Sequence, residues 1–144
     1  MNRRVYLATA GSATLAGLAG CTVVGDVGES LFGEEEYDIG MTRMDFLPEE
    51  YEATVGDTVV WMNTSEADHT VTATETSLPD GAAYFASGGY EDEWSAREAW
   101  HDHHGGRIGT RDTFEHTFET PGIYHYICVP HVYGGMVGRV VVTE

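Results

Sequence analysis

The chain has 144 residues, enough for one domain with extensions and a sizeable hydrophobic core. It carries 24 acidic residues against 7 basic ones, for a net charge of −17, and none of the basic residues is lysine. Such a surface repels nucleic acid and anionic lipid headgroups, so we expect no nucleic-acid partner.

Residues 1–20 have the charged start, the short apolar stretch and the length of a signal peptide. Arg3-Arg4 resembles a twin-arginine export signal, and the Leu-Ala-Gly before Cys21 resembles a lipobox. We therefore predict a mature chain that begins at Cys21, carries lipid on its sulfur and lies on the extracellular face of the cell membrane. The alternatives are a cleaved signal with Cys21 incidental, or an uncleaved anchor helix.

Residues 21–36 are glycine-rich and acidic, which predicts a flexible tether before a domain over 37–144. We expect a first strand over 37–44 and an edge strand or turn around Pro48. Two β-prone runs, 51–55 and 58–62, flank Gly56-Asp57, which predicts a hairpin turn between them. A polar loop then leads to His69, which we expect to begin the next strand.

Residues 76–112 are predicted to be a partly helical or irregular insertion. Within it, 91–104 has the pattern of a short helix that ends at Gly105-Gly106. The histidines at its end could bind a second metal ion, but we favour a solvated acidic segment, because no cysteine accompanies them. These histidines are His101, His103 and His104.

The last third of the chain alternates as strands do. Residues 113–118 place His116 on the same side as two phenylalanines, which favours a core or edge histidine over a ligand. Another alternating run ends at Cys128, and a further strand follows Met136. With the earlier strands, this predicts an all-β fold: a Greek-key sandwich of about seven or eight short strands.

Three potential metal ligands of different softness lie close together in the chain: Cys128, His131 and Met136. A thiolate, two imidazoles and a weak axial thioether form the set that suits a blue-copper electron-transfer site, and His69 is the best second histidine. Zinc is the main rival, but it prefers cysteine and histidine without a thioether. Met41, Met44 and Met62 compete for the axial position without fixed spacing to the cysteine.

The segment 122–138 resembles the ligand loop of the small blue-copper proteins (cupredoxins), especially plastocyanins and the haloarchaeal halocyanins. The matching positions are Gly122, Tyr124, Tyr126, Cys128, Pro130, His131, Gly135, Met136 and Gly138. The resemblance implies one copper ion per chain, held by His69, Cys128, His131 and Met136. It also covers residues 45–75, with one departure: Thr70 stands where the family usually has an asparagine that ties the ligand strands together.

The resemblance implies a Cu(I)/Cu(II) shuttle between redox proteins, such as membrane electron-transfer complexes or oxidases, rather than an enzyme. We expect a monomer. A multicopper enzyme would need further copper centres and domains. A copper carrier or store and a metal-free surface domain remain open alternatives.

A disulfide between Cys21 and Cys128 would exclude both predicted roles of these residues. The acidic charge without lysine predicts a halophile's protein, because at molar salt the Debye length falls to about 3 Å and screens self-repulsion.

Overall fold

The computed structural model describes residues 36–144. The predicted signal peptide, Cys21 and all of the tether except Glu36 therefore lie outside the described residues. Tyr37–Glu144 forms one compact unit. Within the described range, no helix is both long and apolar enough to cross a bilayer.

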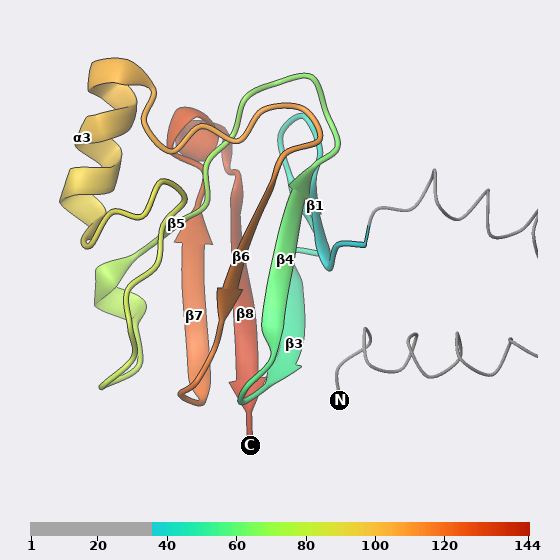
Figure 1. Ribbon diagram of the computed structural model, residues 1–144, viewed down its shortest axis with the longest axis vertical. Coiled ribbons are helices and arrows are strands. Elements are labelled where there is room, and N and C mark those ends of the chain that lie inside the picture. The colour runs from blue at the N-terminus through green and yellow to red at the C-terminus, as the bar shows by residue number, and fades with distance from the viewer. Residues whose placement is uncertain (1–35) are drawn as a thin grey trace, which may run out of the picture. The chain divides into compact units, whose positions relative to one another are not determined.

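Two four-stranded sheets pack face to face in this unit (Figure 1). Strand pairing is antiparallel except where β1 joins β4 and where β3 joins β8. The all-β sandwich predicted from the sequence is confirmed. One sheet has the order β2 (Phe46–Leu47), β1 (Ile39–Met41), β4 (Thr58–Asn63) and β6 (Thr113–Thr117); the other has β3 (Glu50–Thr54), β8 (Val137–Thr143), β7 (Gly122–Ile127) and β5 (Thr72–Ala73).

The core lies between the two sheets and is rich in aromatic rings. On β7, Tyr124 and Tyr126 are buried while Ile123 and His125 face outward, as the alternation in the sequence predicts. From the opposite sheet, Trp61 meets Tyr126 edge-on, with 5.3 Å between ring centroids. Such perpendicular contacts suit aromatic quadrupoles, so this face of β7 is firmly packed where it leads into Cys128.

Position 138 requires glycine because Tyr126 occupies the space that a side chain there would need. It pairs with Tyr126 across β7 and β8. A Cβ atom at this position would lie 2.5 Å from the phenolic oxygen of Tyr126, closer than real contacts allow. The ring therefore covers the strand at the point where the chain leaves the ligand loop.

The hairpin predicted at Gly56-Asp57 is wrong. The flanking strands do not pair: β3 joins β8 in one sheet, and β4 joins β1 and β6 in the other. Gly56 does adopt a turn conformation, with φ of 93°. The turn carries the chain from one sheet to the other. Local turn chemistry does not distinguish such a turn from one that joins two paired strands.

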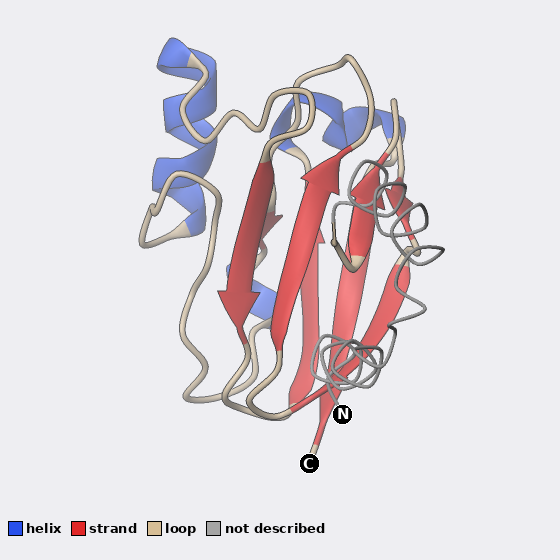
Figure 2. Cartoon of the chain, turned by 45° about the vertical axis from the view of Figure 1, so that its right-hand side comes forward, coloured by secondary structure: helices blue, strands red, loops and turns tan. Residues whose placement is uncertain are grey.

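The segment 76–112, predicted as an insertion, contains the predicted helix, α3 (Glu93–His103), and a short 3₁₀ helix, η2 (Glu75–Ser77), lies at its start. The Asp92 side chain accepts a hydrogen bond from the main chain of Ser95 and so caps the start of α3. Its end differs from the prediction, because His104, rather than a glycine, takes the left-handed conformation (φ 59°). Figure 2 shows α3 beside the sandwich, and the helix contacts β5 and the ligand loop.

The strand predicted to start at His69 is shorter than expected. Only Thr72–Ala73 pairs with β7, because the chain turns into η2 immediately afterwards. His69 instead forms an isolated bridge with Ile108 at the end of the insertion. The insertion therefore helps to hold the first histidine.

Candidate metal centre

The ligand loop joins β7 to β8 at one end of the sandwich. Cys128 follows β7 directly, and the chain then forms a 3₁₀ helix, η3 (Val129–Gly134). Gly135 ends η3 in the left-handed conformation, with φ of 92°, which glycine adopts without strain. This tight turn returns the chain so that Met136 lies beside Cys128.

Main-chain hydrogen bonds fix the loop's three predicted ligands relative to one another. The amide of His131 donates to the carbonyl of Cys128 at 3.1 Å. The amide of Cys128 donates to the carbonyl of Met136 at 3.2 Å. The amide of Met136 donates to the carbonyl of His131 at 3.3 Å. The spacing of these residues in the sequence thus becomes a closed set of contacts.

His69 reaches the loop from a distant part of the chain. Two hydrogen bonds with Ile108, of 3.2 and 2.7 Å, hold its main chain in place. Its Nδ1 atom lies 3.5 Å from the Cys128 sulfur, and the Nδ1 of His131 lies 3.4 Å from the same sulfur. Within residues 36–144, these three residues are the only group of three or more His, Cys, Asp or Glu side chains with converging donor atoms.

The sulfur-to-nitrogen distances fit a shared metal ion. Bonds of about 2.3 Å to sulfur and about 2.0 Å to nitrogen, at an angle of about 110°, put the two donor atoms about 3.5 Å apart. Met136 is fully buried beside this set, tied to Cys128 and His131 through its main chain. A thiolate and two imidazoles with a thioether nearby favour copper over zinc.

The other methionines predicted to compete for the axial position have no main-chain hydrogen bond to Cys128 or His131. Met41 belongs to the core cluster on β1, and Met62 is buried on β4. Met44 is 38 % exposed, and its methyl group lies against Gly134 on the outside of the loop. Of the methionines in the described residues, Met136 alone is placed by hydrogen bonds between the other two loop ligands.

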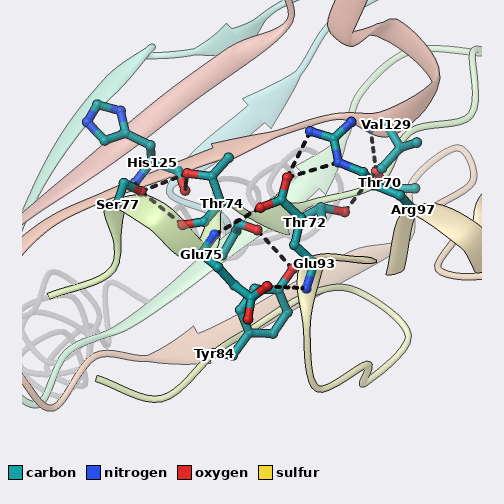
Figure 3. Close-up of polar contacts among 11 residues, drawn as sticks. Thr70, Thr72, Thr74, Glu75, Ser77, Tyr84, Glu93, Arg97, His125 and Val129 are labelled. Atoms are coloured by element: carbon teal, nitrogen blue, oxygen red, sulfur yellow. Dashed lines mark hydrogen bonds and ion pairs between the residues drawn. The ribbon is translucent and has the colours of Figure 1, made fainter. Parts of the chain in front are cut away.

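Thr70 supplies the link between the ligand segments. Its hydroxyl oxygen accepts a hydrogen bond from the amide of Val129 at 2.8 Å (Figure 3). Its own amide points at the Cys128 sulfur, 3.5 Å away. The hydroxyl of Thr72 donates to that of Thr70 at 3.4 Å. The threonine that departs from the expected asparagine therefore still connects the two segments on either side of the sulfur.

A second set of polar groups orients His69, and sequence reasoning missed it. The Nε2 atom lies 3.1 Å from the Ser65 hydroxyl, which donates to the Asn63 side-chain oxygen at 2.8 Å. The amide group of Asn63 donates to the carbonyls of Ala67 and Ile108 at 2.7 and 2.9 Å. Because the Ser65 proton goes to Asn63, the hydroxyl oxygen can accept a proton from Nε2, and in that tautomer Nδ1 is free for a metal ion. The only signal in the sequence was a polar loop just before His69.

Burial shapes the protonation of the metal-free site. Burial, with a smaller effect of the neighbouring His131, lowers the pKa of His69 to about 4, so its imidazole is neutral at pH 7. Burial also raises the pKa of the Cys128 thiol to about 11, although hydrogen bonds from Thr70 and His131 oppose this. A metal ion must therefore displace the thiol proton when it binds.

His131 differs from the other three residues in its exposure. His69, Cys128 and Met136 are fully buried, whereas His131 is partly exposed. The chain around it is apolar, with Pro130 and Val132 partly exposed and Tyr133 almost fully exposed. The site thus reaches the protein surface through one imidazole.

The histidines at the end of α3 take no part in this site. His103 lies 3.4 Å from the Asp102 carboxylate in an exposed position, and His104 stacks on Trp100. No group of converging ligands includes them within residues 36–144. His116, which we expected in the core or at an edge, lies partly buried on β6 and stacks on Phe85.

Comparison with known proteins agrees with the geometry. The family model of the copper binding proteins, plastocyanin/azurin family, matches residues 34–143. The chain belongs to this family. Cupredoxins of this kind carry electrons and are not enzymes, which agrees with the expectation from the sequence, and their cofactor is copper.

Individual relatives of this cupredoxin come from several groups of organisms. It is 30% identical over 138 residues to the chloroplastic plastocyanin minor isoform of Arabidopsis thaliana, covering 96% of this chain and 67% of the relative. Among solved structures, a pseudoazurin from Sinorhizobium meliltoi has a TM-score of 0.55 and 27% identity over 75% of this chain and 73% of its own. An amicyanin from Paracoccus versutus has a TM-score of 0.51 and 26% identity over 76% and 82%.

Proposed function

We propose that this cupredoxin is a one-electron carrier whose copper ion is bound by His69, Cys128, His131 and Met136. The convergence of both imidazole Nδ1 atoms on one sulfur, at 3.4 and 3.5 Å, is the observation that carries the proposal. Copper in such a site exchanges one electron at a time. The chain's own contribution is a set of donors that are already in place before the ion arrives.

The rigidity of the donors favours electron transfer over storage. Cys128 is fixed by main-chain bonds to Met136 and His131, and His69 is fixed by its bonds to Ile108. Donors held in this way do not rearrange when the charge of the ion changes, and a small rearrangement permits rapid outer-sphere transfer. A copper carrier, by contrast, must open its site to release the ion.

The electron would enter and leave through His131, because it is the one ligand that reaches the surface. Its apolar surroundings, which include the exposed ring of Tyr133, would allow a partner to approach closely without stripping water from charged groups. The acidic remainder of the surface would favour a redox partner with a basic face.

Voltammetry of the copper-loaded protein tests this function. The electron carrier gives a reversible one-electron wave whose shape is preserved over repeated cycles. Loss of copper on reduction, or a wave that disappears after the first cycle, would instead identify a carrier or store. His131→Gly with added imidazole provides a further test, because restoration of the site by an external ligand requires that position to open to solvent.

We further propose that the domain is anchored outside the cell by lipid on Cys21, with residues 21–36 as a tether, and that it serves membrane or cell-surface redox proteins as a monomer. The paired arginines and the lipobox-like sequence support this. Mass spectrometry of the mature protein would show a lipidated cysteine as its first residue. An unmodified Cys21 would exclude the anchor.

The acidic composition, with no lysine, supports a halophilic, halocyanin-like protein. Dialysis into dilute buffer should then reduce its folded fraction, because the charges would no longer be screened. Full stability in dilute buffer would contradict the halophilic assignment without affecting the copper site.

A further inference from the structure

A cavity of about 420 Å³ that opens widely to solvent lies apart from the metal centre, between the insertion and the edge strand β6. None of the four predicted copper ligands lines it. From the insertion, residues 84–91 supply most of one wall, and residues 114–116 of β6 supply the other. Its volume is in the range of sites for small ligands.

The walls are built from aromatic rings that the core holds in place. Phe85 is 4 % exposed and stacks on the imidazole of His116, with ring centroids 4.5 Å apart. Phe114 lies 5.6 Å from Trp61 in the core. Tyr84 is fixed by the hydrogen bond from its hydroxyl to the carbonyl of Ala73, at 2.8 Å. Phe85 itself is covered, so a ligand would meet the partly exposed rings of Tyr84 and Phe114, which this packing holds in place.

The charge around the cavity is negative. Glu91 and Glu115 are exposed carboxylates among its lining residues, which include no arginine. Next to it, Glu75 and Glu93 lie beside Tyr84 (Figure 3) and, after burial itself, are among the causes that raise the pKa of this tyrosine, although Arg97, which pairs with Glu93 at 2.9 Å, opposes them. Burial lowers the pKa of His116, so this imidazole adds no positive charge at pH 7.

We propose that this cavity binds a small organic cation with a methylated ammonium group. Aromatic faces attract such a cation through their quadrupoles, and two carboxylates at the rim add attraction at close range. A bare metal ion fits less well, because it needs several converging oxygen ligands and this cavity offers mainly rings. A zwitterion with its own carboxylate would be repelled by the rim, so choline should bind more tightly than glycine betaine.

Isothermal titration of the copper-loaded full-length protein with choline, at constant potassium chloride, tests the proposal. We expect saturable binding, at least about tenfold tighter than that of 3,3-dimethyl-1-butanol, which has the same shape without the charge. Equal binding of this neutral analogue, or no saturable binding of choline, would overturn the proposal.

Variants locate the binding. Glu91→Gln with Glu115→Gln should weaken choline binding about threefold or more, because the cation loses both carboxylates. Glu98→Gln, which removes an exposed carboxylate from α3 outside the cavity lining, should leave it unchanged. Because Glu98→Gln removes one charge and the cavity variant removes two, weakening by Glu98→Gln of about half the cavity variant's effect or more, in free energy, would show that choline responds only to the general acidity of the surface, which would also overturn the proposal. The absorption of the copper site reports that each variant is folded.

Discussion

The amide of Val129 donates a hydrogen bond to the hydroxyl oxygen of Thr70 at 2.8 Å, and this contact joins the two segments that carry the predicted ligands. Thr70 is 2 % exposed, so water cannot take its place. Each of the two residues follows directly after a ligand, His69 in one segment and Cys128 in the other. The contact therefore couples the position of the first histidine to that of the sulfur.

Thr70→Val should destabilise the protein by about 1–3 kcal/mol, because it leaves the buried amide of Val129 without an acceptor. Thr70→Ser keeps the hydroxyl and should retain most of the stability. Denaturant unfolding at fixed salt measures both. A valine variant as stable as the wild type would show that the hydrogen bond makes no net contribution.

Ser65→Ala should weaken copper binding about 10–100-fold, the usual effect of removing a partner that orients a ligating histidine. The variant removes the hydroxyl that lies 3.1 Å from the Nε2 atom of His69. Competition with a chromophoric chelator measures the affinity. Ser77→Ala is the matched control, because Ser77 bonds to Thr74 and His125 on η2 and β7, away from the ligands. Equal affinities of the two variants would exclude the orienting role.

Met136→Leu should raise the reduction potential while the fold remains intact. Leucine has a similar volume, but it offers no sulfur lone pair to stabilise the more positively charged oxidised ion. Voltammetry gives the shift. Met62→Leu, at another buried methionine, should leave the potential unchanged. If the reduction potential shifted only in the Met62 variant, Met62 rather than Met136 would be the axial ligand.

His116 should make the protein less stable in mild acid. Burial lowers its pKa from the ordinary 6.5, so below pH 6.5 the unfolded chain binds a proton that the folded chain does not bind. The free energy of unfolding should then fall between pH 7.5 and pH 5 more steeply in the wild type than in His116→Gln. Titrations of the other groups occur in both proteins and cancel in the difference. Parallel pH profiles would contradict the assignment of a neutral His116.

The sequence predicted the parts of the site that depend on short spacing. Cys128, His131 and Met136 lie within one tight turn, so their order along the chain already sets their geometry. The helix α3 was also predictable, since it is local and Asp92 caps it. The hairpin predicted at Gly56-Asp57 was wrong, because a turn signal does not say which sheet each flanking strand joins.

Contacts between distant segments could not be predicted from local patterns. The bonds of Asn63 and Ser65 around His69 depend on how the polar loop folds back, and those of Asn63 and His69 to Ile108 span the whole insertion. Thr70 was recognised in the sequence as a departure from the expected asparagine, but its hydrogen bond from Val129 became visible only in the structure. The groups that tune the site are thus the ones that the sequence alone reveals least.

The visible absorption spectrum of the copper-loaded protein in concentrated salt tests the central claim most directly. If His69, Cys128 and His131 share one copper ion, the oxidised protein has an intense blue thiolate absorption that bleaches on reduction and returns on oxidation. Cys128→Ser should abolish it. A wild-type protein that stays colourless with cupric ion, or a serine variant that keeps the same absorption, would contradict the account.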